Sequence, residues 1–193
     1  TGDRVRYDPA MKRAWSGLFC LLVAGCAAIP PANWARGGAT LDLPRARWVR
    51  GDLFVDLMPD GRIFVNGSPE ATLDRAGRLY DEDAQPIALL EPDGRVVGPD
   101  EEPLGQVGVM HAARPDEAQA WLTVTESGEV IRYDDEGERT TYGVWMGCNG
   151  SARAHQACVL VTHVLATRLR PPEGANGSGV SLGIGIGVGI PIR

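Results

Sequence analysis

The sequence predicts a mainly β fold of repeated antiparallel hairpins, followed by one C-terminal amphipathic helix and a glycine-alternating final strand. Three observations predict this fold. Glycine turns recur at an even spacing between Trp48 and Tyr142, residues 151–169 contain no Gly or Pro, and apolar residues then alternate with glycine. The hairpins could form a meander, a roll or a shallow barrel, and closure would remove the exposed sheet edges.

The N-terminal region has the composition of a secretory signal. Residues 1–10 have no signal character, and we interpret them as an upstream extension. Residues 11–25 begin with the basic group Met11-Lys12-Arg13, continue with an apolar run and end with the small residues Ala24-Gly25. The apolar run is shorter than the roughly 20 residues that a membrane-spanning helix needs. An ordinary buried helix is the alternative interpretation.

The end of this segment, Leu22-Val23-Ala24-Gly25-Cys26, resembles the lipobox of bacterial lipoproteins. The resemblance implies cleavage before Cys26 and attachment of lipid to its thiol and new amino group. Two or more acyl chains anchor a protein stably. The following residue is Ala27 rather than Asp, which in that family favours the outer membrane, facing the periplasm.

The charge of the chain argues against nucleic acid as a partner. The whole chain has a formal charge of −6, and residues 1–25 carry four basic and two acidic side chains, so the predicted mature part carries −8. All of its basic residues are Arg, because Lys12 is the only lysine. An acidic surface repels phosphate backbones and anionic lipid headgroups.

Residues 26–47 are rich in Pro, Ala, Gly and Arg, and we expect a flexible tether there. The folded domain is expected over residues 48–193, with Trp48 opening its first strand. Within it, turns in which Gly is followed by Arg or Glu and then an apolar residue place glycines at 61, 77, 94 and 128, in steps of 16, 17 and 34. Such turns between apolar segments are a strong hairpin signal. The missing turn of this series is expected near His111-Ala112, where Arg114-Pro115-Asp116 has the composition of a longer, irregular loop, and another turn is expected at Glu136-Gly137.

This hairpin spacing behind a lipobox resembles the β-flower proteins, shallow barrels that are similar in outline to Tubby-like domains. The resemblance covers about residues 50–145 and depends on turn spacing. It implies an apolar inner channel and contact with lipid, and it implies no catalytic residues.

The segment from Ser151 to Leu169 predicts the amphipathic helix, because its apolar residues recur at steps of three and four. Ser151 is a suitable N-cap, and we expect His155 and His163 to be partly exposed. Beyond it, residues 180–190 alternate branched apolar residues with small ones, four of them glycine, which predicts a strand with something packed against its glycine face. A core or edge strand, a membrane contact and a second copy of the chain are the three interpretations.

Four cysteines are present, and Cys148 and Cys158 remain after export and acylation. An exported protein lies in an oxidising compartment, so we expect a disulfide between them. A metal site that includes His155 and His163, and two free thiols, are the alternatives. The acidic clusters 81–83 and 134–136 are expected to be solvated turns rather than calcium loops.

No nucleophile, zinc or phosphate-loop motif occurs in the sequence, so we expect no enzyme and no cofactor. Two function classes remain. The first is an envelope lipoprotein with a structural or interaction role, and the second is a binder or carrier of lipid or another apolar ligand inside the barrel. A filled interior with an exposed apolar patch would favour the first class, and an open apolar pocket would favour the second.

Overall fold

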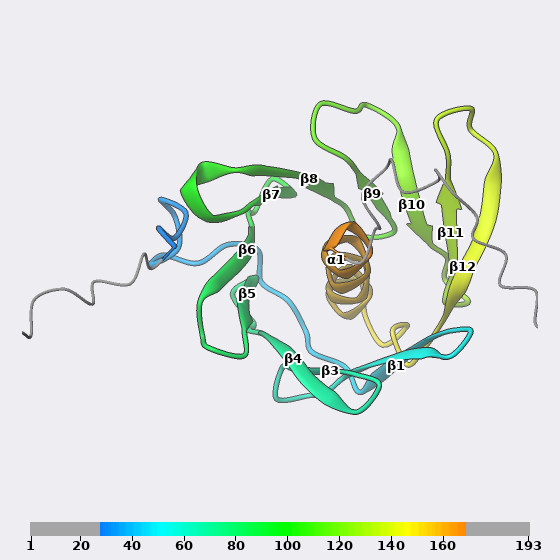
Figure 1. Cartoon of the computed structure of the whole chain (residues 1–193), viewed down its shortest axis with the longest axis horizontal. Coiled ribbons are helices and arrows are strands. Elements are labelled where there is room, and N and C mark those ends of the chain that lie inside the picture. Colours follow the sequence, from blue (N-terminus) through cyan, green and yellow to red (C-terminus); the bar gives the residue numbers. More distant parts are fainter. Residues whose placement is uncertain (1–27, 169–193) are drawn as a thin grey trace, which may run out of the picture.

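The computed structural model describes residues 28–168, which form a closed ring of twelve antiparallel strands around one helix (Figure 1). Each strand pairs with its neighbours in sequence, and the first strand pairs with the last. The mainly β prediction with hairpins and one C-terminal helix is therefore confirmed, and the barrel is the form that the hairpins take.

The first six strands are β1 (Ala46–Arg50), β2 (Leu53–Leu57), β3 (Arg62–Val65), β4 (Ser68–Leu73), β5 (Arg78–Asp81) and β6 (Pro86–Leu90). The others are β7 (Arg95–Val97), β8 (Pro103–Val107), β9 (His111–Ala113), β10 (Ala120–Val124), β11 (Glu129–Tyr133) and β12 (Arg139–Met146). A short 3₁₀ helix, η2 (Pro99–Glu101), precedes β8, and helix α1 (Ala152–Arg168) follows the strands.

The repeating turns lie together at one end of the barrel, which we call the glycine-turn end (residues 58–61, 74–77, 91–94, 108–110 and 125–128). The predicted glycines occupy four of these turns with positive φ, for example Gly61 at 90° and Gly94 at 91°. The fifth turn, at 108–110, comes directly before His111, and the irregular loop expected at 114–116 belongs to a separate connection at 114–119 that follows β9. We call the opposite end, with turns at 51–52, 66–67, 82–85, 98–102, 114–119 and 134–138, the loop end.

The even spacing has a structural cause at the glycine-turn end. The last carbonyl of each turn accepts a hydrogen bond from the final residue of the next hairpin. Leu73 N–H donates to the Gly61 carbonyl at 2.9 Å, and the same bond recurs through Leu90, Val107, Val124 and Trp145. One repeat therefore advances the ring by one hairpin, and the period reflects this series of bonds between successive hairpins.

The interior of the barrel is packed in layers that follow the same period. Fully buried residues precede the five turns, namely Leu57, Leu73, Leu90, Val107 and Val124. A second buried layer follows the turns, with Ile63, Leu79, Val96, Ala112 and Val130. Apolar side chains at such alternate positions of each strand face one side, so the barrel buries a continuous core.

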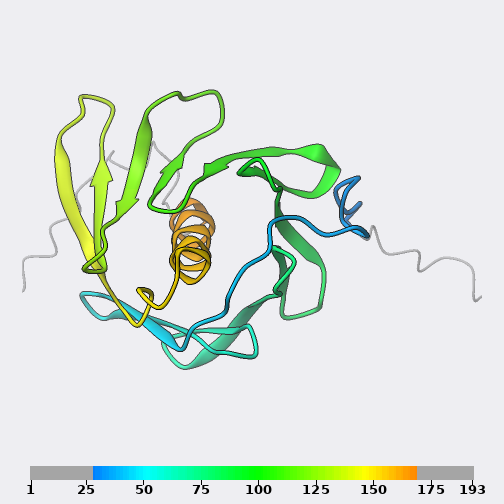
Figure 2. The same cartoon turned by 180° about the vertical axis from the view of Figure 1, so that it is seen from behind.

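Helix α1 lies inside the ring, as the views from both sides show (Figures 1 and 2). Every residue from Ala157 to Ala166 is buried, which covers nearly three turns. The expectation of an amphipathic helix is therefore wrong, because the barrel surrounds the helix and leaves it no solvated face. The N-cap prediction is confirmed, since the Ser151 hydroxyl accepts from the Ala154 N–H at 3.0 Å.

The segment expected to be a flexible tether differs from the prediction. We call residues 29–43 the strap; it begins beside η2, where the Asp100 N–H donates to the Ile29 carbonyl, and then runs along the glycine-turn end. Leu41 is only 1% exposed, and its N–H donates to the Arg75 carbonyl at 3.0 Å. The N–H groups of Gly38 and Ala39 donate to the Ala76 and Leu90 carbonyls, both at 2.7 Å. Backbone bonds and one buried leucine therefore attach the segment to the barrel, although its composition is typical of a linker.

Three predicted features lie outside the described residues. They are the signal peptide, the lipidation residue Cys26 and the glycine-alternating strand at 180–190. The twelve strands of residues 46–146 close the ring among themselves. Among residues 28–168, the structure contains no helix that is both long and apolar enough to span a bilayer.

Candidate functional site

The barrel interior is the first candidate site, because it would hold the ligand of a carrier. Its centre is occupied by α1, which forms polar contacts with several strands. Trp145 Nε1–H donates to the Thr162 hydroxyl at 2.7 Å, and the Gln156 amide donates to the Val107 carbonyl at 3.2 Å. These bonds fix the rotation and depth of the helix, because each requires one side chain at one height in the barrel.

Both helix histidines take part in this attachment. The Trp121 indole N–H donates to His163 Nδ1 at 2.9 Å, while His163 Nε2 lies 2.7 Å from the Leu104 carbonyl. The ring is therefore the neutral tautomer with its proton on Nε2. His155 Nε2 lies 2.9 Å from the Val124 carbonyl.

The expectation that His155 and His163 are partly exposed is wrong, since they are 6% and 0% exposed. Burial lowers the pKa of His163 from its ordinary value of 6.5, and the bond to the Leu104 carbonyl acts in the opposite direction. One sequence signal could have revealed this burial. Within α1 the only charged residues are Arg153 and Arg168, near its two ends, which is unusual for a helix with a solvated face.

The predicted disulfide between Cys148 and Cys158 is present, with its Cα atoms 6.2 Å apart. It joins the chain after β12 to the second turn of α1, and both cysteines are buried. Its position therefore fixes the entry of the helix into the barrel. No group of three potential metal ligands is found in the described part of the chain.

The two acidic clusters form turns at the loop end. One oxygen of Asp81 accepts from the N–H groups of Asp83 and Gln85, at 3.0 and 2.7 Å. Asp134 likewise accepts from the Glu138 N–H at 2.8 Å. Both aspartates thus close their own turns, which is the usual role of this residue type there.

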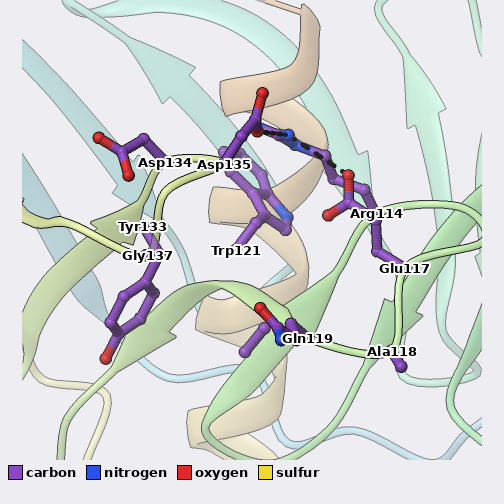
Figure 3. A pocket seen from close by; sticks show the side chains of 10 residues that line it. Arg114, Glu117, Ala118, Gln119, Trp121, Tyr133, Asp134, Asp135 and Gly137 are labelled. Atoms are coloured by element: carbon purple, nitrogen blue, oxygen red, sulfur yellow. Dashed lines mark hydrogen bonds and ion pairs between the residues drawn. The ribbon is translucent and has the colours of Figure 1, made fainter.

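A surface groove of about 620 Å³ lies between the β9–β10 connection and the β11–β12 turn (Figure 3). In its wall, Arg114 Nη1 lies 3.4 Å from a Glu117 oxygen and 3.0 Å from an Asp135 oxygen. The Arg114 guanidinium also lies over the Trp121 ring, 5.2 Å from its centroid. Asp134 adds a third carboxylate to the lining. The groove is therefore net negative, its cation is already neutralised, and it contains no histidine for proton transfer.

An apolar patch lies on the outer face of β12, β1 and β2, and we call it the outer patch (the exposed Val49, Val144 and Met146 with the half-buried Phe54). Val49 pairs with Val144 on one side and with Phe54 of β2 on the other. Val144 and Met146 are 43% and 54% exposed, although larger apolar residues usually face the interior. The ion pair between Arg47 and Asp56 borders the patch at 2.6 Å. A patch with an apolar centre and a charged rim has the composition of a protein contact surface.

Comparisons with known proteins found no counterpart. No family model matches the chain, no curated protein matches it in sequence, and no solved structure matches its fold.

Proposed function

We propose that this chain is a lipoprotein of the bacterial cell envelope with a non-enzymatic structural or interaction role. The lipobox-like segment supports an anchor through lipid on Cys26, in the outer membrane and facing the periplasm. One observation carries the interaction role. The barrel interior is filled by the protein's own helix, whereas apolar side chains remain exposed on the outer patch.

The alternative function, a binder or carrier of lipid or another apolar ligand, needs apolar space inside the barrel. Ligand pockets usually enclose 300–1,000 Å³, roughly the volume of a small ligand with its contacts. Here the corresponding space holds α1, and its side chains bond to β8, β10 and β12. A ligand would have to displace a helix that a disulfide and several buried hydrogen bonds hold in place.

The outer patch supports a protein partner with an apolar cluster of its own. Val49, Val144 and Phe54 form one row across three strands, and the charged pair at the rim would orient the partner. Apolar residues at the centre of an interface contribute affinity, and rim charges mainly contribute specificity.

Lipid anchoring is tested by mass spectrometry of protein extracted from the membranes of its native host. We expect an N-terminal Cys26 that carries acyl chains. Protein that retains Met11 and remains in the soluble fraction would contradict the anchor.

The contact surface is tested with a photoreactive amino acid at Met146 in the native host. We expect a crosslinked product of defined mass, which disappears with Val144→Asp and persists with Ser68→Asp, an exposed position on β4. The purified partner should then bind the parent chain and fail to bind Val144→Asp. A product of twice the monomer mass would identify a second copy as the partner. Equal crosslinking from a photoreactive group at Ser68 would contradict a specific surface.

The carrier alternative is tested by native mass spectrometry of the same material. We expect no lipid beyond the chains attached to Cys26. A stoichiometric, non-covalent lipid would favour the carrier.

A further inference from the structure

Three polar side chains start from the interior face of the barrel near the loop end, where Arg50 is exposed and Arg132 is half-buried. Arg50 lies two residues after the buried Trp48, so both side chains start from the same face of β1. Arg132 lies directly across from the fully buried Leu122 and therefore also starts on the interior face. Tyr142 of β12 is 8% exposed and lies beside them.

Both guanidinium groups lie against the same aromatic ring. Arg50 Cζ is 3.7 Å from the centroid of Tyr142, and its Nη1 donates to the Tyr142 hydroxyl at 2.6 Å. Arg132 Cζ is 5.8 Å from the same centroid. Both positive charges are thus held against one side chain, and like charges repel each other unless an anion lies nearby.

Neither arginine has a carboxylate partner within residues 28–168. The ion pairs there use Arg47, Arg62, Arg78, Arg95 and Arg114, each bonded to an aspartate or glutamate. Other arginines there, such as Arg36 and Arg139, also form no ion pair, but Arg50 and Arg132 are the two that lie against the same aromatic ring. Their charge is available to a ligand.

The buried tyrosine adds a directed donor to these charges. Its hydroxyl oxygen already accepts from Arg50, so its own proton is free to donate. Arg50 uses one of the five N–H groups of a guanidinium in this bond. No acceptor for the Tyr142 proton occurs among the described residues.

We propose that Arg50, Arg132 and Tyr142 form a binding site for a phosphate group, either free or in a lipid headgroup. A tetrahedral anion has several oxygens, and two guanidinium groups and a hydroxyl on different strands can donate hydrogen bonds to them. A planar carboxylate needs only one arginine. The site is a local exception to the acidic surface. It goes beyond the proposed function and does not depend on the lipid anchor.

The test uses the full chain with Cys26→Ala, which removes the predicted acylation site and leaves the barrel unchanged. Inorganic phosphate and dihexanoyl phosphatidylglycerol are titrated separately by calorimetry. Fluorescence of Trp48, whose ring centroid lies 5.8 Å from that of Tyr142, gives a second readout. The variants are Arg50→Gln, Arg132→Gln and Tyr142→Phe. Arg153→Gln is the matched control, because Arg153 is exposed at the opposite end of the barrel.

We expect saturable binding by the parent chain and roughly tenfold or greater weakening in each arginine variant, as for loss of a charged hydrogen bond. Tyr142→Phe keeps the ring and should weaken binding while the melting curve shows a folded barrel. Arg153→Gln should bind as the parent does. Tighter binding of the lipid than of phosphate identifies a headgroup, and equal binding identifies a free phosphate.

Two results would overturn the site. One is the absence of saturable binding of both probes by the parent chain. The other is equal weakening by Arg153→Gln and Arg50→Gln, which would show only a general effect of charge. A lipidated Cys26 in the native host would leave the anchoring proposal intact in either case.

Discussion

At the residue scale, His163 links the position of the helix to pH. Its Nδ1 accepts a hydrogen bond from the Trp121 indole, and its Nε2 donates to the Leu104 carbonyl. Protonation of Nδ1 would therefore leave the indole N–H without an acceptor. The guanidinium of Arg114, itself paired with Glu117 and Asp135, lies over the Trp121 ring.

We predict that the barrel loses stability on mild acidification. Burial holds the pKa of folded His163 below its ordinary value of 6.5, so the unfolded chain binds more protons below that pH. The contribution of His163 is thus complete above about pH 6.5 and decreases as the pH falls further. Melting temperatures measured from about pH 8 to about pH 5 should show this decrease. His163→Gln should have a lower melting temperature at neutral pH, and its melting temperature should change less across this pH range. An equal dependence of melting temperature on pH in both proteins would contradict the assignment to His163.

Gly105 permits the close approach of β8 to the helix. Its φ is +120°, and a Cβ there would meet the Ala113 carbonyl and lie 3.1 Å from His163 Nε2. We predict that Gly105→Ala lowers the free energy of unfolding by about 2 kcal/mol or more, through combined overpacking and backbone strain. Gly67→Ala is the control, because Gly67 has φ +86° but open space around it. Urea denaturation should show a clearly smaller loss of unfolding free energy for Gly67→Ala. Equal losses in both variants would mean that backbone strain alone, without overpacking, destabilises Gly105→Ala.

At the element scale, the disulfide holds the entry of α1. We predict that Cys148→Ala with Cys158→Ala lowers the free energy of unfolding by roughly 2–3 kcal/mol, because the ten-residue separation closes a short loop. Reductant should destabilise the parent chain in denaturant titrations and leave the double variant unchanged. A parent chain that is insensitive to reductant would contradict a stabilising role.

The strap should behave as part of the core. Its residue Leu41 is 1% exposed, so Leu41→Ala is predicted to lower the free energy of unfolding by about 2–5 kcal/mol, as for other buried leucines. Ile29, at 66% exposed, provides the matched control, and Ile29→Ala should change stability by less than about 0.5 kcal/mol. Chemical denaturation of both variants measures the difference. Two small and equal effects would support the linker that the sequence indicated.

Strands and turns could be predicted from the sequence because their chemistry is local. Gly61, Gly77, Gly94 and Gly128 take positive φ in tight turns wherever the sequence places them between apolar segments. The strap could not be predicted this way, since its attachment depends on carbonyl groups of residues 75–90, which composition does not reveal. The sequence contained no indication of the proposed phosphate site. Arg50 lies far from Arg132 and Tyr142 in the chain, and the three come together only when β1 pairs with β12 to close the ring.

At the scale of the whole molecule, the helix and the ring depend on each other. The interior layers of the barrel are apolar, and without α1 they would face water. We predict that a chain ending at Gly150 binds the dye 1-anilinonaphthalene-8-sulfonate strongly, as proteins with exposed apolar surface do. A chain ending at Arg168 retains the helix and should bind little dye. Equal dye fluorescence from both chains would contradict the dependence.

The seam between β1 and β12 governs when the fold can form. It pairs Arg47 with Met146, so the ring closes only after nearly all of the described chain has emerged. Joining such distant segments carries a large loop-closure entropy and slows folding compared with local hairpin formation. Before β1 and β12 pair, a growing chain exposes two unpaired sheet edges and the apolar interior face of the strands. Helix α1, which covers that face, is synthesised last. Folding of this protein therefore has a late, concerted step, and the interval before that step is when a chaperone would have to protect it.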